Sequence, residues 1–229
     1  MIDIARNLED VQSKIRTACE KSGKSFFDIT LVAVSKTQSP ASISELANLG
    51  VKDFGENRVQ ELLEKLPQIP QSLTWHMIGH LQTNKVKSII DKVALIHSVD
   101  SFRLVQEIDK QAKAHEKIME ILVEINIAAE RSKYGIEPGE LPEFLTSIVG
   151  FQNVMVKGLM CMAPYVENPE ENRLYFRKMR QMFVDSKARS ANNINMCTLS
   201  MGMTNDYEVA IEEGANMIRI GTAIFGARV

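Results

Sequence analysis

The feature that most constrains the fold is the regular alternation of short apolar runs with longer segments of helical pattern. The apolar runs, rich in Val, Ile and Leu, predict strands at residues 29–34, 53–55, 74–78, 95–99, 121–127, 156–161, 196–199 and 217–220. The segments between them predict helices near residues 41–49, 59–66, 84–91, 102–116, 141–149, 170–188 and 208–213. Strands that alternate with helices pair in parallel through right-handed crossovers, so the pattern predicts an α/β fold.

Two turns near the end of the sequence have the composition of phosphate-binding loops. Gly221 and Thr222 follow the last predicted strand, and Ser200 and Gly202 follow the strand before it. Such turns offer backbone N–H groups and a hydroxyl with little side-chain bulk, which suits a phosphate. Two adjacent turns of this kind are typical of the loops after strands 7 and 8 of a (β/α)8 barrel, which often build a phosphate site.

Eight strands therefore favour a closed (β/α)8 barrel of the TIM type over an open, Rossmann-like sheet, and no strand is followed by the Gly-x-Gly-x-x-Gly pattern. An extra helix is predicted before the first strand, because five apolar residues share one helical face: Ile4, Leu8, Val11, Ile15 and Cys19. Too little sequence follows Ile220 for a full eighth helix, so we expect the N-terminal helix to cover that gap. Residues 1–229 contain no linker or repeat, and we expect one domain.

The composition argues against several classes of function. A formal net charge of −2 offers nothing to recruit nucleic acid or an anionic membrane, and no apolar run reaches the roughly 18 residues of a membrane span. The segment from Met1 to Gly23 is charged and amphipathic without a signal-peptide core, which predicts a cytoplasmic protein. The cysteines Cys19, Cys161 and Cys197 have no metal-ligand spacing, so we expect buried, reduced thiols and no metal site.

Polar residues gather where the predicted strands end, on the face where barrels of this type carry their active sites. They are Lys36, Glu56, Asn57, His80, Asp100, Asn126, Ser200 and Thr222. Lys36 follows a buried strand, where desolvation lowers the pKa of an amine and prepares it to form a Schiff base with an aldehyde. The alternative is a lysine whose ammonium group simply reaches solvent. Glu56 is either a base or, as we expect, an exposed carboxylate at the start of a helix.

Other residues on this face allow a structural interpretation as readily as a functional one. Arg219 lies within the last predicted strand and requires a partner, either in a structural ion pair or on a ligand. The hydroxyls of Ser200 and Thr222 either bind a phosphate or cap their loops. His76 and His80 flank one strand end without a third ligand, so we expect them in the core or at the rim and not in a metal site.

Seven ordered segments carry a resemblance to a known family. They are residues 33–37 (Ala-Val-Ser-Lys-Thr), 54–57 (Phe-Gly-Glu-Asn), 75–79 (Trp-His-Met-Ile-Gly), 132–135 (Ser-Lys-Tyr-Gly), 157–160 (Lys-Gly-Leu-Met), 199–203 (Leu-Ser-Met-Gly-Met) and 219–226 (Arg-Ile-Gly-Thr-Ala-Ile-Phe-Gly). Through them the chain resembles the pyridoxal phosphate homeostasis proteins along nearly its whole length. The resemblance implies a single barrel like the N-terminal domain of alanine racemase, the fold type III barrel without its C-terminal β-domain, with pyridoxal 5′-phosphate (PLP) as the cofactor.

The resemblance also assigns roles to residues of this sequence. Lys36 would hold the cofactor aldehyde as an internal aldimine, while Ser200, Gly202, Gly221 and Thr222 would hold the phosphate. These roles agree with the predicted fold, because strand 1 and strand 8 become neighbours when a barrel closes. A cofactor with an aldehyde and a phosphate on opposite sides of its ring would bridge the two strands.

By the same resemblance, Arg219 would face the pyridine nitrogen and Asn57 would lie beside the cofactor. His80 and Arg58 depart from the family, which often has proline and tyrosine at these places. The departures concern the shape of the barrel mouth and leave the attachment of the cofactor unaffected.

The resemblance implies an intracellular protein that binds PLP in vitamin B6 homeostasis without substantial turnover, and the alternative is a PLP-dependent amino-acid racemase. A lysine aldolase acting on a phosphorylated sugar is a remoter option. Racemases take a second base, a tyrosine, from a C-terminal domain that does not follow Val229, which leaves Tyr134 and Tyr165 as substitutes. Arg219 would keep the pyridine nitrogen unprotonated and make the ring a poorer electron sink. Both points favour a carrier, expected to be a monomer, whose partners would be apo-enzymes that use PLP.

Overall fold

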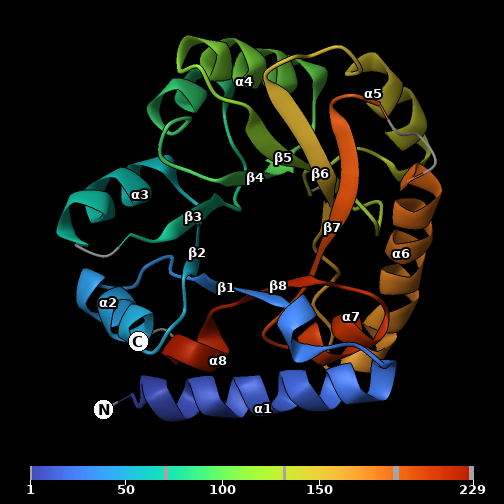
Figure 1. Cartoon of the computed structure of the whole chain (residues 1–229). Helices are drawn as coiled ribbons and strands as arrows, with labels where there is room; N and C mark the ends of the chain where they lie inside the picture. Colours follow the sequence, from blue (N-terminus) through green and yellow to red (C-terminus); the bar gives the residue numbers. More distant parts are fainter. Residues whose placement is uncertain (1, 70–71, 131–132, 188–190, 227–229) are drawn as a thin grey trace.

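The first strand pairs with the last, and this pairing closes the sheet. The computed structural model describes residues 2–69, 72–130, 133–187 and 191–226. All neighbouring strands are parallel and follow one another in sequence order around a closed barrel (Figure 1). The strands are β1 (Thr30–Val34), β2 (Asp53–Glu56), β3 (Thr74–Met77), β4 (Leu95–Val99), β5 (Met119–Ile125), β6 (Val154–Cys161), β7 (Ile194–Met203) and β8 (Met217–Ile220). The predicted (β/α)8 barrel is therefore confirmed, and the open sheet is excluded by the β1–β8 pairing.

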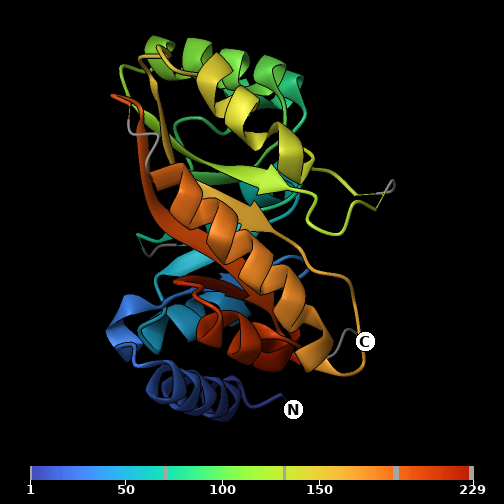
Figure 2. The same ribbon diagram turned by 90° about the vertical axis from the view of Figure 1, so that its right-hand side faces the viewer.

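Helices surround the barrel on its outside (Figure 1). The α-helices are α1 (Ile4–Ser22), α2 (Pro40–Asn48), α3 (Val59–Lys65), α4 (Phe102–Ala114), α5 (Leu141–Ser147), α6 (Arg173–Lys187), α7 (Tyr207–Glu212) and α8 (Thr222–Phe225). Short 3₁₀ helices are η1 (Phe26–Asp28), η2 (Leu66–Gln68), η3 (Thr83–Ser88), η4 (Pro138–Glu140) and η5 (Pro169–Asn172). The arrowheads of β5 and β6 point to the same side in Figure 2, and this side is the C-terminal mouth of the barrel.

The apolar core has two parts. The larger part fills the space between the strands and the surrounding helices. The smaller part comes from strands β1, β4, β5, β6 and β8 and consists of Val32, Leu95, Leu122, Met160 and Met217. Each large apolar side chain buried in this way contributes roughly 1.5–3 kcal/mol relative to exposure.

Helix α1 covers the part of the barrel where the last helix is short. Asp3 caps the start of α1 by accepting a hydrogen bond from the N–H of Arg6 (3.0 Å), and Gly23 ends it in the left-handed conformation (φ 67°). The side-chain amide of Asn7 donates to the carbonyl of Ile224 in α8 (2.9 Å). Because α8 has only 4 residues, the apolar face of α1 packs against α7 and α8, as the sequence predicts (Figure 1).

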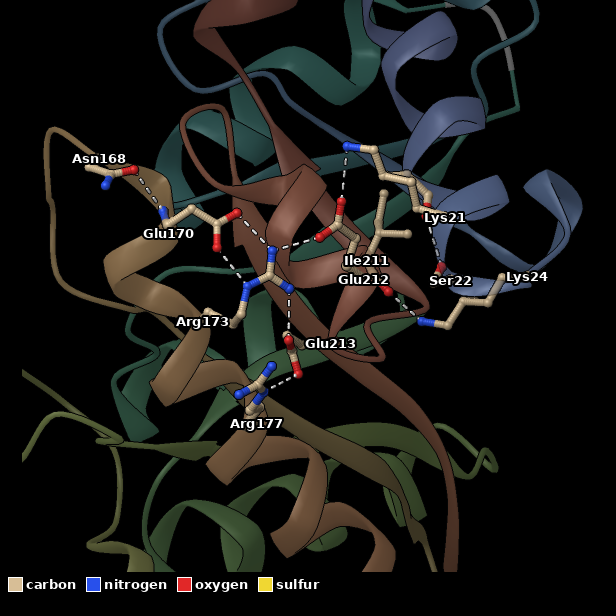
Figure 3. Close-up of polar contacts among 11 residues, drawn as sticks. Lys21, Ser22, Lys24, Asn168, Glu170, Arg173, Arg177, Ile211, Glu212 and Glu213 are labelled. Carbon is tan, nitrogen blue, oxygen red and sulfur yellow. Dashed lines mark hydrogen bonds and ion pairs between the residues drawn. The ribbon is translucent and has the colours of Figure 1, made fainter.

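A cluster of ion pairs joins the helices on this side of the molecule (Figure 3). Arg173, at the start of α6, contacts Glu170 (2.6 Å), Glu212 (2.6 Å) and Glu213 (2.7 Å). Lys21 of α1 lies 3.4 Å from the same Glu212. The guanidinium group therefore ties α6 to the end of α7, and Glu212 extends the connection to α1.

Some predicted elements differ from those observed. The predicted helix at 84–91 is the shorter 3₁₀ helix η3. Strand β7 extends to Met203, beyond the predicted end at residue 199, because the chain continues along β6 and β8 and turns only at Gly202, which has a φ of 91°. Cys197 is exposed, contrary to expectation, because the first half of β7 alternates between buried and exposed positions. Ser132 and Ala188, which belong to a family segment and a predicted helix, lie outside the described residues.

Within the described residues, none of the helices combines the length and the apolarity that crossing a lipid bilayer requires.

Candidate functional site

The turn after β1 and the turn after β8 are neighbours at the C-terminal mouth. Ala33 lies opposite Ile220 in the parallel ladder, so Lys36 and Gly221 follow paired strands. A Cβ atom on Gly221 would lie 3.3 Å from both the Cβ and the carbonyl oxygen of Val34, which is tighter than most real contacts. Lys36 is half-buried and Thr222 is exposed. The structure thus brings an amine and a Gly-Thr turn together, as the sequence predicts.

The end of β7 requires glycine for two independent reasons. Gly202 has a φ of 91°, and a Cβ atom there would lie 2.6 Å from the Cβ of Ala210. Immediately afterwards, the N–H of Met203 donates to Oδ1 of Asp206 (2.7 Å), and Oδ2 of Asp206 accepts from the amide of Asn172 (2.8 Å). The loop is therefore fixed by packing against α7 and by a buried carboxylate.

Thr204 connects this loop to the next one. Its Oγ1 accepts a hydrogen bond from the N–H of Ala223 (3.4 Å), in the first turn of α8. Sequence reasoning missed Thr204, although a hydroxyl two residues after Gly202 was a usable signal. The loops after β7 and β8 thus form one continuous surface of backbone N–H groups, glycines and hydroxyls.

Beside this surface lies a cavity of about 560 Å³. Its lining includes Met162, Tyr165, Met203 and Asp206, together with the charged pair Glu130 and Lys133. The Nζ of Lys133 lies 2.6 Å from Oε1 of Glu130. A volume of this size admits a small molecule from solvent to the loop after β7.

Arg219 is buried inside the barrel with both of its terminal nitrogens engaged. Nη1 donates to Oγ of Ser200 (2.5 Å), and Nη2 donates to the carbonyl of Cys161 (2.8 Å). Burial lowers the pKa of Arg219, yet a guanidinium of this kind stays protonated. Ser200 is itself fully buried, so its hydroxyl is engaged beneath the loop with Arg219.

A chain of hydrogen bonds continues from Ser200 through the barrel to its opposite end. Oγ of Ser200 lies 3.2 Å from Nδ1 of His97, Nε2 of His97 lies 2.9 Å from Nδ1 of His76, and Nε2 of His76 lies 3.0 Å from Oδ1 of Asp53. Ser200 accepts from Arg219, so its own proton goes to His97, and each following nitrogen then donates onward to the Asp53 carboxylate.

The imidazoles of His97 and His76 must both be neutral for hydrogen bonds to be donated in this direction, from Ser200 towards Asp53. Burial holds the pKa of His97 well below its usual range, and the neighbouring His76 and Arg219 lower it further. Sequence reasoning missed His97, although a histidine inside the fully buried strand β4 was a usable signal. His76 lies in the core, in agreement with expectation.

Glu124 of β5 is a second acidic residue that sequence reasoning missed. Its side chain is almost fully buried, and its Oε2 atom has no hydrogen-bond partner among the described residues. Burial and the nearby Asp100 raise its pKa to about 7, while Arg219 opposes the rise. An acidic residue that follows the apolar run at residues 121–123 within a buried strand was the available signal. The orphaned oxygen leaves one hydrogen-bonding position open inside the barrel.

At the rim, His80 makes an aromatic contact across the mouth. Its ring stacks on Tyr134 with centroids 3.7 Å apart and an interplanar angle of 10°, and its Nδ1 lies 3.6 Å from Oδ2 of Asp100. Asn57 is half-buried just after β2, and Arg58 is exposed. The two departures from the family pattern thus lie at the rim, where His80 joins the turn after β3 to the turn after β5.

Glu56 does not have the exposed position that the sequence predicts. It is fully buried, and its Oε1 lies 2.7 Å from Nζ of Lys65 and accepts a hydrogen bond from Oγ of Ser35 (2.7 Å). The expectation was wrong because β2 extends to Glu56 and α3 turns back over it. Burial raises the pKa of Glu56, and the hydrogen bonds from Lys65 and Ser35 oppose that rise.

The site therefore combines a lysine, two adjoining small-residue loops and a buried cation. Such a set suits a small anionic molecule that also carries a carbonyl group, since the loops accept an anion and the amine accepts the carbonyl. Asn57 and Glu124 add polar groups at the sides of the barrel mouth.

Comparison with known proteins gives a consistent result over the whole sequence. Residues 6–229 match the family model for the N-terminal domain of alanine racemase. The pyridoxal phosphate homeostasis protein of Aquifex aeolicus (strain VF5) is 44% identical over 228 residues, which cover 99% of each chain. The protein of the same name from Escherichia coli (strain K12) is 38% identical, covering 100% of this chain and 98% of its own.

Solved structures agree with these relatives. PipY of Synechococcus elongatus PCC7942, solved with PLP bound, superposes with a TM-score of 0.85 at 31% identity, covering 98% of this chain and 100% of its own. An alanine racemase from Clostridium difficile 630 has a TM-score of 0.72 at 15% identity, covering 98% of this chain and 56% of its own, and shares the fold alone. The chain therefore belongs to the pyridoxal phosphate homeostasis protein family, within the larger family of the alanine racemase N-terminal domain.

Proposed function

We propose that this protein binds PLP and holds it in reserve for vitamin B6 homeostasis, without substantial turnover of its own. The observation that carries the proposal is the pairing of β1 with β8, which sets Lys36 beside Gly221 and Thr222 above the buried Arg219. The names of the relatives and the PLP-bound PipY structure support it.

The residues present fit the chemical groups of PLP. When bound, PLP supplies an aldehyde, a phosphate and a pyridine ring. The Lys36 amine would hold PLP through its aldehyde group, which supplies reversible covalent attachment to an amine. The backbone N–H groups near Gly202 and Gly221 and the hydroxyl of Thr222 hold the phosphate, with Thr204 joining the two loops.

Ser200 acts on the ring side of the site in this proposal. Its hydroxyl already contacts Arg219 and His97, so it would fix the guanidinium that is proposed to face the pyridine nitrogen. Asn57 would lie beside the ring. The orphaned Oε2 of Glu124 supplies a further hydrogen-bonding position in the same interior.

The same residues argue against the racemase alternative. A guanidinium at the pyridine nitrogen keeps that nitrogen unprotonated and weakens the ring as an electron sink. A racemase also needs a second base that is held in place. Tyr165 is 88% exposed, and a tyrosine so open to solvent lacks the burial that fixes a catalytic base. Tyr134 is 54% exposed and stacks on His80 at the rim.

The proposal is tested by the absorption spectrum of the protein after loading with PLP, before and after reduction with borohydride. Peptide mass mapping is expected to locate one pyridoxyl group on Lys36. The control is Lys85→Ala, which removes an exposed lysine of η3 and leaves the modification unchanged. A pyridoxyl group on another lysine, with Lys36 unmodified, contradicts the assignment.

Turnover is tested by exchange of the α-proton of amino acids in deuterated water. A carrier gives only slow exchange. Exchange at about 1 s⁻¹ or faster that Lys36→Ala abolishes would make the protein a racemase.

We further propose that the protein acts in the cytoplasm as a monomer and delivers PLP to apo-enzymes. The reversible attachment at Lys36 supports delivery, because an incoming amine displaces the lysine without breaking a difficult bond. Size-exclusion chromatography and transfer of cofactor to a purified apo-enzyme test these two points.

A further inference from the structure

The residues on either side of Lys36 are held by a buried charged group that the proposed function does not use. We call Glu56, Glu61 and Lys65 the Lys65 cluster. Lys65 lies on α3 and is 6% exposed. Its Nζ contacts Oε1 of Glu56 (2.7 Å), Oε1 of Glu61 (2.6 Å) and the carbonyl of Ser35 (2.7 Å). All three donors of the ammonium group are therefore engaged.

The residue before Lys36 is fixed at three points. Ser35 is fully buried, its N–H donates to the carbonyl of Gly55 (3.0 Å), and its Oγ donates to Glu56 (2.7 Å). Its carbonyl accepts from Lys65 as well as from the N–H of Gln38 (2.9 Å). Ser35 therefore connects the end of β1 to the Lys65 cluster.

The residue after Lys36 is fixed in an unfavourable conformation. Thr37 has a φ of 65°, a left-handed backbone that a β-branched residue rarely adopts. Its N–H donates to Oε1 of Glu61, the same oxygen that contacts Lys65. A conformation of this kind persists only where surrounding contacts enforce it, and Glu61 does so together with the hydrogen bond from Gln38 to Ser35 that closes the turn.

We propose that the Lys65 cluster is a positioning device for Lys36, which holds the backbone on both sides of that lysine so that its amine meets an incoming aldehyde in one orientation. The inference rests on the proposed function, because it assumes that Lys36 is the attachment residue. The inference assigns a positioning role to three residues that do not themselves contact the cofactor. Glu56 and Lys65 act through Ser35, and Glu61 acts through Thr37.

The test compares two probes on variants of Glu61. PLP attaches to Lys36, whereas pyridoxine 5′-phosphate lacks the aldehyde and binds only through its ring and phosphate. Glu61→Ala removes the acceptor for Thr37 but leaves Lys65 its contacts with Glu56 and Ser35. Because Glu61 is partly exposed, with 21% of its side chain accessible, we expect this variant to fold.

We expect Glu61→Ala to slow covalent attachment of PLP about tenfold or more, while its affinity for pyridoxine 5′-phosphate stays within about twofold. Glu61→Gln keeps an oxygen acceptor for the N–H of Thr37 and is expected to restore the rate. The matched control is Glu64→Ala on the same helix, whose exposed carboxylate contacts Gln60 (3.0 Å) and not the Lys36 turn.

Two other outcomes would contradict the positioning inference, and a third would contradict the proposed function. Attachment at the wild-type rate in Glu61→Ala overturns the positioning inference, and so does an equal loss of both probes, which indicates general damage to the fold. If the unaltered protein binds pyridoxine 5′-phosphate but attaches no PLP at Lys36, the proposed function fails instead, and the variants need not be compared.

Discussion

Ser200 accepts a hydrogen bond from Arg219, with 2.5 Å between Oγ and Nη1, in a part of the barrel where both side chains are buried. The same hydroxyl donates to His97. A serine in this position has a role in the protein itself, whether or not a phosphate binds nearby.

Ser200→Ala is therefore expected to destabilise the protein when no cofactor is added. The substitution leaves a guanidinium N–H and Nδ1 of His97 without their partner, at a cost of about 1–3 kcal/mol. Urea unfolding measures the loss. The control is Ser98→Ala, another buried serine, whose hydroxyl makes a single bond to the carbonyl of Gly79 (2.6 Å) and whose loss is expected to be smaller. Unchanged stability in Ser200→Ala would indicate a phosphate role alone.

Thr222→Val is expected to weaken PLP retention on the order of tenfold or more, because a hydrogen bond to a charged group contributes about 1.5–3 kcal/mol. Thr222 is exposed, so the fold is expected to tolerate the change, and Thr222→Ser keeps the hydroxyl as a control. The measurement is the affinity for PLP relative to pyridoxal, which has no phosphate. If the substitution lowers both affinities equally, Thr222 does not contact the phosphate.

Glu124 is expected to make the stability of the protein depend on pH. Its pKa in the folded state is about 7, above the ordinary value of 4.5. Between these values the unfolded chain loses the proton and the folded chain keeps it, so stability falls as pH rises from about 4.5 to about 7. The full effect is roughly 3 kcal/mol for this shift.

Glu124→Gln removes this titration. Relative to the unaltered protein, the variant should gain stability at about pH 8 compared with about pH 5. Urea unfolding at the two pH values, without cofactor, gives the difference directly. If Glu124→Gln and the unaltered protein differ in stability by the same amount at both pH values, the pKa of Glu124 is not raised in the folded protein.

Arg173 is expected to contribute measurably to the attachment of α6 to α7, because it contacts three carboxylates and only 23% of its side chain is accessible. Arg173→Met should cost about 1–2 kcal/mol, or roughly 2–8 °C in the melting temperature for a chain of this length. High salt should reduce the loss.

Arg177→Met is the matched control for Arg173→Met. Arg177 lies on the same helix, has 67% of its side chain accessible and, among the described residues, forms an ion pair with Glu213 alone (3.0 Å), so its loss should stay below about 0.5 kcal/mol. Equal losses in the two variants would mean that the cluster in Figure 3 adds nothing beyond single surface ion pairs.

Much of the fold follows from the sequence because it depends on local pattern. Strands β4 and β8 begin and end where the apolar runs predict, and the turn residues Lys36 and Gly221 follow from the strand ends. Closure of the barrel then brings these two turns together without further information. The position of the candidate site could therefore be predicted from the spacing of the apolar residues and the order of the strands.

The hydrogen bonds inside the barrel could not be predicted from the sequence in the same way. Ser200 and His97 are 103 positions apart, and nothing local in either segment indicates that their side chains meet. Glu56 looked like an exposed helix start, because only the folded chain brings Lys65 and Ser35 to its carboxylate. Buried hydrogen bonds depend on which side chains the closed barrel brings within about 3 Å of one another, and a one-dimensional pattern does not contain that information.

The pairing of β1 with β8 also has a consequence for the synthesis of the protein. Residues 217–220 emerge last from the ribosome among the strands, and until then β1 and β7 each have an unpaired edge. A nascent chain that already contains seven strands is thus an open sheet, and open edges pair readily with other chains. We expect newly made protein to be exposed to such pairing during this interval, and substitutions in β8 that slow its docking should lower the yield of folded protein more than the stability of molecules that have already closed.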